Sequence, residues 1–341
     1  MGATNHQLSI VAQRLHGWYA ANARDLPWRR TRDPYAIWIS EIMLQQTQVK
    51  TVIPYFERWM RELPTIAAFA RARPQKVLKL WEGLGYYTRA RQAQAAARQI
   101  MERHGGEFPR TFEEILALPG IGRYTAGAIS SIAFRQPEPI LDGNVIRVLT
   151  RLFGVEGDPR EKETNGALWE LARRLVTLQP EHCSELNQSL MELGALVCVP
   201  RQAKCPTCPV RRSCFAHKED RVAEFPMLPA RAAATERRFT AFVARREDRF
   251  LVRQRPAGVV NSHLWEFPNA EHNESGAGKL FRVIDSEPIC RIRHSITRYR
   301  ILLEAFHAEP KDNTAGEWKT LSQLRRLPFA SAHRRILNAL I

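Results

Sequence analysis

The chain has 341 residues, 44% of them hydrophobic and 25% charged, which is an ordinary globular composition with enough apolar residues for two domains. Lysine and arginine number 51 against 35 aspartate and glutamate, a formal net charge of +16. No run approaches the roughly 18 apolar residues of a membrane span, and the polar N-terminal segment does not resemble a signal peptide. These totals exclude a membrane-spanning protein and predict an intracellular one.

The basic excess is uneven along the chain. It lies in residues 1–100 and 201–341, whereas residues 101–200 carry slightly more acidic than basic side chains. Positive charge in two stretches suits a polyanion held between them. Nucleic acid is the first candidate, and an acidic membrane surface is the second.

Residues 6–197 show helical periodicity almost throughout. Apolar residues recur at spacings of three and four, as in Leu186, Leu190, Leu193 and Val197, and short breaks with glycine or proline separate the segments. No convincing alternating strand occurs here. We therefore predict an all-α region over the first two thirds of the chain.

A helix predicted from about Tyr35 carries Glu41 on its apolar stripe, with Ile37, Trp38 and Leu44 as neighbours. Most helix glutamates are solvated surface residues. Burial on this stripe would instead raise the pKa of the carboxyl group and favour a protonated acid.

The string LPGIGRYTAGA, residues 118–128, predicts a turn between two helices. Gly120 and Gly122 lack Cβ atoms, so backbone N–H groups at the start of the second helix can approach a phosphate. For a lone Gly-X-Gly, a plain tight turn would be the better interpretation. The whole string in a basic all-α chain favours a phosphate contact.

Asp142 precedes the helical run VIRVLTRLFG and is predicted to be its N-cap. That position is compatible with catalysis, because a helix N-terminus stabilises an ionised carboxylate. One protonated and one ionised carboxyl group form the pair that glycosidic cleavage uses. Spacing alone does not pair Asp142 with Glu41.

Four of the six cysteines lie within 17 residues, with the spacing C-x6-C-x2-C-x5-C: Cys198, Cys205, Cys208 and Cys214. In an intracellular chain such a cluster predicts a metal site rather than disulfides. Four thiolates suit zinc and an iron–sulfur cluster about equally.

Residues 217–238 are polar, charged and proline-bearing, which is typical of a linker. The pattern then changes. Residues 238–255 predict two strands around a charged turn, residues 298–310 another strand, and residues 321–341 helix. A smaller α+β domain is therefore expected over residues 239–341.

Five segments together resemble the MutY-type adenine DNA glycosylases, which belong to the helix-hairpin-helix base-excision superfamily. They are SEIMLQQTQV (40–49), GLGYYTRAR (83–91), LPGIGRYTAGA (118–128), LDGNVIRVL (141–149) and MELGALVC (191–198). The resemblance covers nearly the whole chain. It implies a DNA repair enzyme that flips out and excises adenine mispaired with 8-oxoguanine, or with guanine, in double-stranded DNA.

The resemblance also implies roles for single residues. Glu41 would protonate adenine N7, and Asp142 would stabilise or transiently trap the sugar cation, while Tyr124 and Asn144 would position and polarise the site. The expected DNA and adenine contacts are Gln46 and Tyr86, which would fill the space left by the flipped adenine, the hairpin glycines Gly120 and Gly122, and the pocket residues Trp28, Leu44, Val49 and Gln188.

Tyr124 bears on the reaction type. Related glycosylases that also nick the strand carry lysine at this place in the hairpin, and its amine attacks the sugar to form a Schiff base. A phenol cannot form an imine, and no lysine occurs between Lys79 and Lys162. We therefore predict a monofunctional glycosylase that stops at the abasic site.

The superfamily resemblance favours a [4Fe–4S] cluster on the four cysteines. It implies a catalytic region at 1–216, with a helical barrel from about 30 to 134 and an iron–sulfur subdomain from 1–29 plus 135–216. A linker at 217–238 and a Nudix-like domain at 239–341 would follow, the latter sensing 8-oxoguanine.

The last domain departs from its relatives in three places. It has the LWEFP segment of Nudix-like domains but lacks their glutamate-rich Mg²⁺-binding helix, so we expect it to read rather than hydrolyse. In the loop HSITRYR, Thr297 and Arg298 are expected to contact the oxidised base, although Ile296 and Arg298 replace an aromatic residue and a histidine. A hairpin turn with solvated arginines is the alternative. His263 stands where glycine is usual.

Two other functions remain open. An oxidised-pyrimidine glycosylase-lyase is disfavoured by Tyr124 and by the second domain, and a non-catalytic DNA-damage binder by the presence of both Glu41 and Asp142. We expect a monomer that works in the cytoplasm on nucleoid DNA, or in the nucleus if the source is eukaryotic.

Overall fold

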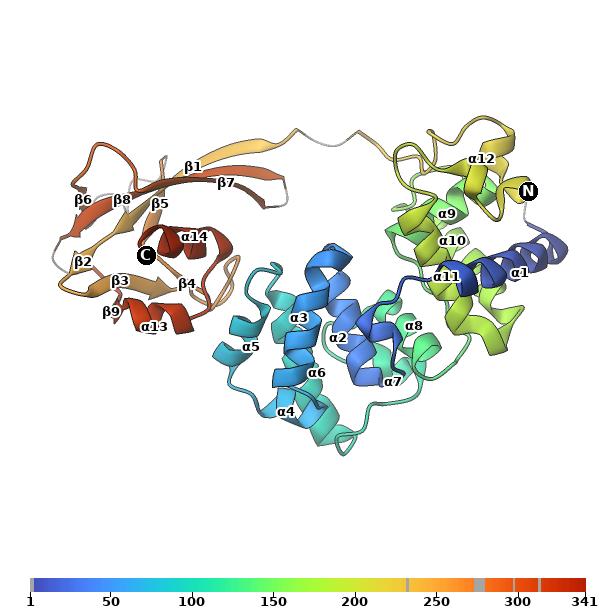
Figure 1. Cartoon of the computed structure of the whole chain (residues 1–341), viewed down its shortest axis with the longest axis horizontal. Helices are drawn as coiled ribbons and strands as arrows, with labels where there is room; N and C mark the ends of the chain where they lie inside the picture. Colours follow the sequence, from blue (N-terminus) through green and yellow to red (C-terminus); the bar gives the residue numbers. More distant parts are fainter. Residues whose placement is uncertain (1–2, 231–232, 273–279, 297, 312–313) are drawn as a thin grey trace. The chain divides into compact units, whose positions relative to one another are not determined.

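The computed structural model describes residues 3–230, 233–272, 280–296, 298–311 and 314–341 (Figure 1). The chain forms two compact units, one of residues 1–70 and 95–230 and the other of residues 71–94 and 231–341. Each unit therefore joins segments that are distant in the sequence. None of the helices in the described ranges has the length and hydropathy that crossing a membrane would require.

The first unit is helical, and its described residues include no strand, as predicted. Its elements are α1 (Asn5–Asn22), η1 (Pro27–Arg29), α2 (Pro34–Leu44), α3 (Val49–Glu62), α4 (Ile66–Arg71), α7 (Phe112–Leu116), α8 (Arg123–Ile132), α9 (Gly143–Phe153), α10 (Lys162–Thr177), η2 (Pro180–His182), α11 (Cys183–Leu196), η3 (Cys205–Thr207), η4 (Arg211–Ser213) and α12 (Phe215–Lys218). Helix α6 (Thr88–Arg103) runs from the second unit into the first.

Side-chain caps begin several of these helices. Thr4 and Thr111 form capping boxes at α1 and α7, and the carboxylates of Asp33 and Asp142 accept backbone N–H bonds at α2 and α9. Helix α9 ends at Gly154 with φ +65°, a conformation that glycine adopts without steric cost. Asp142 is thus the N-cap that its sequence context predicts.

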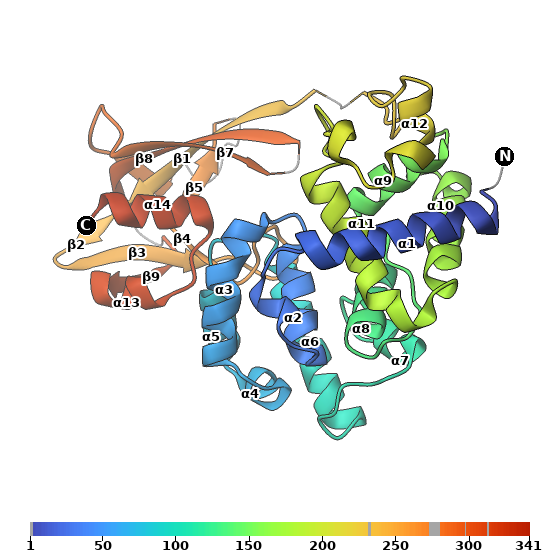
Figure 2. The ribbon, with the colours of Figure 1, turned by 45° about the vertical axis from the view of Figure 1, so that its right-hand side comes forward.

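Helix α1 packs against α10 and α11, and α9 packs against α11 (Figure 2). Their shared core includes the fully buried residues Leu8, Leu149, Leu175 and Leu190. This packing brings the start of α9, which carries Asn144, against the C-terminal end of α11 at Gly194.

The second unit contains α5 (Pro74–Trp81), the start of α6 and two small sheets. The strands are β1 (Thr235–Val243), β2 (Arg245–Arg246), β3 (Arg249–Gln254), β4 (Trp265–Glu266), β5 (Asn269–Glu271), β6 (Phe281–Val283), β7 (Cys290–Ile296), β8 (Tyr299–Pro310) and β9 (Glu317–Thr320). One sheet has the order β5-β1-β8-β6, with β7 also paired to β8, and the other has β2-β3-β4, with β9 paired to β3. The long β1–β8 pair is parallel, from Thr235↔Tyr299 to Val243↔His307.

Helices α13 (Leu321–Arg326) and α14 (Ser331–Ala339) complete this unit, and the predicted α+β class is confirmed. Helix α14 packs against β4 and β7, and Ile336 and Leu337 enter the core with Phe267 and Phe329. Strand β1 begins inside the segment predicted as linker. The predicted domain boundaries remain a prediction, and the compact units group residues 71–94 with the C-terminal sheets.

Candidate active site

A cavity of about 510 Å³ opens in the first unit between η1, α2, α8, α9 and α11. Nine residues proposed from the sequence line it: Trp28, Glu41, Leu44, Gln46, Val49, Tyr124, Asp142, Asn144 and Gln188. The two carboxylates, which spacing could not pair, therefore face one cavity.

Glu41 lies on the buried side of α2, with 4% of its surface exposed. Burial raises its pKa to about 7, while the hydrogen bond donated by the Tyr124 hydroxyl to Glu41 Oε2 acts in the opposite direction. Near neutral pH a substantial fraction of this carboxyl group is therefore protonated, as a general acid requires.

Asp142 accepts two hydrogen bonds, from the backbone N–H of Val145 to Oδ1 (2.7 Å) and from Asn144 Nδ2 to Oδ2 (2.8 Å). Both bonds favour the ionised form, as expected of an N-cap. Burial nevertheless outweighs them and raises the pKa of Asp142 above its ordinary value. The helix N-terminus limits this rise without reversing it.

The effect of the Tyr124 hydroxyl on the pKa of Glu41 can be tested by substitution. Because its hydrogen bond favours ionised Glu41, Tyr124→Phe should raise the pKa of Glu41. If protonated Glu41 drives the predicted release of adenine, the rate of release should fall above a pH of about 7 in the wild type. In Tyr124→Phe this fall should occur at higher pH. Single-turnover rates between pH 5 and 9 test this, and a fall at unchanged or lower pH contradicts it.

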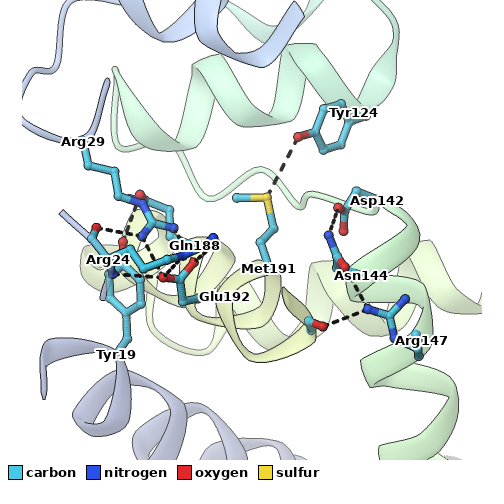
Figure 3. Close-up of polar contacts among 11 residues, drawn as sticks. Tyr19, Arg24, Arg29, Tyr124, Asp142, Asn144, Arg147, Gln188, Met191 and Glu192 are labelled. Atoms are coloured by element: carbon cyan, nitrogen blue, oxygen red, sulfur yellow. Dashed lines mark hydrogen bonds and ion pairs between the residues drawn. The ribbon is translucent and has the colours of Figure 1, made fainter. Parts of the chain in front are cut away.

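A buried ionic cluster closes one side of the cavity, and sequence reasoning missed it. Glu192 is fully buried and accepts hydrogen bonds from Arg24 Nε and Nη2 at 2.8 and 2.7 Å and from Arg29 Nη1 and Nη2 at 3.1 and 3.0 Å (Figure 3). Burial alone would raise the pKa of Glu192, but the bonds from both arginines lower it to about 2. This wall of the cavity thus carries an ionised carboxylate that two guanidinium groups hold in place.

Helical spacing could have revealed part of this wall. Gln188, Met191, Glu192 and Ala195 follow one another at the intervals of a single face of α11, and all four line the cavity. Arg24 and Arg29 flank Trp28 in the sequence, but nothing in the sequence pairs them with a carboxylate more than 160 residues away. Tyr19 of α1 joins the wall by donating a hydrogen bond from its hydroxyl to Gln188 Oε1 (3.0 Å).

The four clustered cysteines line a second, much smaller pocket of about 30 Å³. Buried Arg151 donates from Nη1 to Cys198 Sγ (3.5 Å) and to the Val199 carbonyl (2.8 Å). Arg151 thus ties the first cysteine of the cluster to the loop that follows it. Within the described ranges no three histidine, cysteine or carboxylate side chains are grouped as a metal-ion site.

Arg147 connects this loop to the catalytic carboxylate. Its Nε donates to the Cys198 carbonyl (2.7 Å), and its Nη2 donates to Asn144 Oδ1 (2.8 Å) and to the Gly194 carbonyl (2.8 Å). Asn144 in turn donates to Asp142 (Figure 3). Two side chains therefore separate the first cysteine of the cluster from Asp142.

Gly194 permits the close approach of α11 to α9. A Cβ atom at this position would lie 2.6 Å from Asn144 Cβ and 3.0 Å from the Asn144 carbonyl oxygen. Gly194→Ala should displace Asn144, lower the free energy of unfolding by about 1–3 kcal/mol and slow the reaction. Urea denaturation and single-turnover kinetics measure the two effects.

Gly166 in α10 provides the matched control, because a Cβ atom there would meet nothing within 4 Å. Gly166→Ala should stabilise the helix by about 0.5–1 kcal/mol and leave the reaction unchanged. Equal stability of the two alanine variants would contradict the proposed clash at Gly194.

The hairpin glycines lie in the turn between α7 and α8. Gly120 adopts φ +75°, and Gly122 is the N-cap of α8 without a side-chain cap. A Cβ atom on Gly122 would meet nothing within 4 Å. The start of α8 is thus open to a ligand, as a phosphate contact requires.

Both residues predicted to fill the DNA stack have left-handed backbone conformations, with φ +56° at Gln46 and +47° at Tyr86. Such strain in residues other than glycine is concentrated at functional sites. Tyr86 is 50% exposed, whereas its neighbour Tyr87 is buried. The structure therefore separates the exposed tyrosine from the one that packs.

The predicted lesion-reading loop is only partly described. Thr297 lies outside the described residues. Arg298 is exposed and donates to the Tyr299 hydroxyl (3.1 Å) in a hairpin between β7 and β8. His263 has φ +64°, which explains why glycine is usual at this position.

Comparisons with known proteins agree with this architecture. Residues 39–174 match the family model of the HhH-GPD superfamily base excision DNA repair protein, and residues 240–339 match that of the NUDIX domain. Among solved structures, a thermostable thymine-DNA glycosylase aligns with TM-score 0.58 and 31% identity over 64% of this chain and 100% of its own. An endonuclease III–DNA complex, 23% identical over 64% of this chain and 99% of its own, shares the fold with TM-score 0.55.

Curated relatives are adenine DNA glycosylases. That of Rattus norvegicus is 47% identical over 231 residues, which is 65% of this chain and 44% of the relative. Those of Buchnera aphidicola (from Schizaphis graminum) and Schizosaccharomyces pombe are 36% and 32% identical over 76% and 80% of this chain, and 75% and 74% of their own lengths. The chain thus spans less than half the length of the mammalian relatives it matches.

Proposed function

The chain belongs to the adenine DNA glycosylase family, and on that premise we propose that it excises adenine mispaired with 8-oxoguanine or guanine from double-stranded DNA and leaves an abasic site. The observation that carries the proposal is the pair of carboxyl groups, Glu41 and Asp142, that face one cavity large enough for a flipped base. Because DNA is the proposed substrate, we propose that the protein acts in the compartment that holds DNA.

In the proposed reaction, Glu41 gives its proton to N7 of adenine. The bond between C1′ and N9 then breaks, and its electron pair leaves with the base. Ionised Asp142 stabilises the positive charge that develops on the sugar, and addition of water completes hydrolysis. Tyr124 and Asn144 hold the two carboxyl groups through the hydrogen bonds described above.

Strand cleavage through a Schiff base is not part of the proposal. The residues found to line the cavity include no lysine, and Tyr124 occupies the hairpin position where a lyase would place its amine. The enzyme should release adenine and leave the strand intact until alkali is added.

We also propose that Cys198, Cys205, Cys208 and Cys214 hold a [4Fe–4S] cluster. The cluster would supply a covalent anchor for the loop between these cysteines. Support comes from the four thiols around one pocket, the Arg151 guanidinium beside Cys198 and the endonuclease III-like fold. The cluster would then hold the basic residues of this cysteine loop in place for phosphate contact: Arg201, Lys204, Arg211 and Arg212.

Purified protein should therefore be brown and contain about four irons per chain. Inductively coupled plasma analysis and the visible spectrum test this. Arg151→Met, which removes the guanidinium beside the sulfur, should lower iron retention, whereas Arg201→Met should not. Stoichiometric zinc in a colourless protein would contradict the cluster.

The decisive experiment uses duplexes that contain 8-oxoguanine·A, G·A and 8-oxoguanine·C. We expect free adenine from the first two, faster from the first, and strand breaks only after alkali. Release of an oxidised pyrimidine with borohydride-trapped protein would favour a glycosylase-lyase, and binding without base release would favour a damage binder.

A further inference from the structure

The loop that carries Tyr86 is fastened at both ends to the C-terminal part of the chain. We infer that Glu82 and Arg91 are positioning residues for lesion discrimination, because they make the placement of Tyr86 depend on the NUDIX part. This inference rests on the proposed function. It concerns residues of the second compact unit, in which residues 71–94 cluster with residues 231–341.

The upstream fastening is Glu82, at the end of α5. Its Oε1 accepts hydrogen bonds from the backbone N–H of Phe329 (2.8 Å) and from Arg334 Nε (2.8 Å). Its carboxylate also accepts a bond from Lys79 Nζ (2.6 Å). The Glu82 side chain is only 13% exposed, so these bonds are shielded from competing water.

The same place has a second layer of contacts. Lys79 Nζ and Arg334 Nη2 both donate to the Leu327 carbonyl, at 3.1 and 2.6 Å. Helix α14 begins after Ala330 without a side-chain cap, and the Glu82 anion bonds to the backbone just before it. A negative charge near a helix N-terminus is favourable. Glu82 thus binds the start of α14 specifically.

The downstream fastening is Arg91, one turn into α6. Its Nη1 donates to the Ser262 carbonyl (2.8 Å), and its Nη2 donates to Thr88 Oγ1 (2.9 Å). Ser262 is 4% exposed and lies in the loop that leads into β4. Residues 83–90 therefore lie between two attachments to the NUDIX part.

Between the attachments the loop is held internally. Trp81 Nε1 donates to the Gly85 carbonyl (3.0 Å), and Arg89 Nη2 donates to the carbonyls of Leu84 (3.1 Å) and Gly85 (3.2 Å). The Arg89 guanidinium also lies 5.3 and 5.4 Å from the ring centres of Trp81 and Tyr86. Because these contacts restrain the loop, a displacement of either attachment should also displace the exposed Tyr86 ring.

Bond cleavage and insertion into the duplex would therefore depend on different compact units. The carboxylates that break the bond belong to one compact unit, and the aromatic side chain expected to enter the duplex belongs to the unit expected to read 8-oxoguanine. Insertion of Tyr86 would then proceed best when that unit is seated on the lesion.

The test compares Glu82→Gln and Arg91→Met with the wild type in the full-length chain. Single-turnover rates of adenine release are measured on 8-oxoguanine·A and on G·A, and the ratio is the readout because the fraction of folded protein cancels. Both variants should reduce the ratio by roughly three- to thirtyfold, mainly by slowing the 8-oxoguanine·A duplex. 2-Aminopurine placed beside the lesion should report slower insertion, a signal that Tyr86→Ala removes.

Glu309→Gln is the matched control, since Glu309 is half-exposed, belongs to the same unit and pairs only with exposed Arg282 among the contacts found for it. Its ratio should equal that of the wild type. An unchanged ratio in Glu82→Gln and Arg91→Met, or equal slowing on both duplexes, overturns the inference. A wild type that releases no adenine overturns the proposed function itself, and the inference with it.

Discussion

Glu41→Gln is expected to slow adenine release by about a hundred- to ten-thousandfold, the range over which a positioned general acid contributes. Glutamine has nearly the same size and can still pair with the Tyr124 hydroxyl, but it has no acidic proton. Binding to the 8-oxoguanine·A duplex should be nearly unchanged. Single-turnover kinetics and an electrophoretic binding assay measure the two quantities.

Glu57→Gln is the control for this change, because Glu57 is an exposed carboxylate on α3. It should retain the wild-type rate. Adenine release by Glu41→Gln within a few-fold of the wild type would exclude Glu41 as the acid.

The same substitution has a pH-dependent effect on stability. The folded-state pKa of Glu41, about 7, exceeds its ordinary value of 4.5, so the folded state binds the proton more tightly than the unfolded state does. The contribution of Glu41 to the free energy of unfolding of the wild type therefore falls as pH rises from about 4.5 through 7. Glutamine does not titrate. Its stability relative to the wild type should rise over this range, by up to about 3 kcal/mol.

Asp142→Asn is expected to produce a loss of similar size by a different route. A full charge about 4 Å from the developing cation contributes roughly 4 kcal/mol at an effective dielectric constant of about 20, so its removal should slow the reaction about a thousandfold. Asparagine still caps α9, and because burial opposes ionised Asp142 the variant should be at least as stable as the wild type.

Asp33→Asn isolates the contribution of the charge. Asp33 caps α2 in the same manner, through a bond from the backbone N–H of Tyr35 (3.1 Å), but does not line the cavity. Both variants keep their caps, and only Asp142→Asn should lose activity. If Asp33→Asn were equally slow, the effect would be that of helix capping and not of charge at the sugar.

Much of this site could be predicted because its chemistry is local in sequence. The apolar stripe around Glu41 indicates burial, the run after Asp142 indicates a cap, and the cysteine spacing indicates a shared ligand. These local signals do not show which residues that are far apart in the sequence meet in the fold. Nothing local shows that Tyr124 donates to Glu41, 83 residues away, or that Arg24 and Arg29 enclose Glu192.

The pKa of Asp142 shows a different limit. A cap position indicates hydrogen bonds that favour the anion, and those bonds are present. How deeply the residue is buried depends on how α9 meets α11, and the close approach of these helices at Gly194 is visible only once both helices are placed. The fold class was predictable from periodicity, whereas the grouping of residues 71–94 with the C-terminal sheets was not, because it rests on contacts that span more than 170 residues.

That grouping has a consequence for how the protein is made. Lys79 and Glu82 leave the ribosome about 250 residues before Leu327 and Arg334, an interval of roughly ten to fifty seconds at ordinary rates of synthesis. Strand β1 likewise cannot pair until its parallel partner β8 has been synthesised, and such non-local pairing is slow. The nascent chain therefore completes its catalytic carboxylates before it can complete the unit that holds Tyr86, and a prematurely terminated chain would keep α5 without its partners as a target for chaperones and proteases.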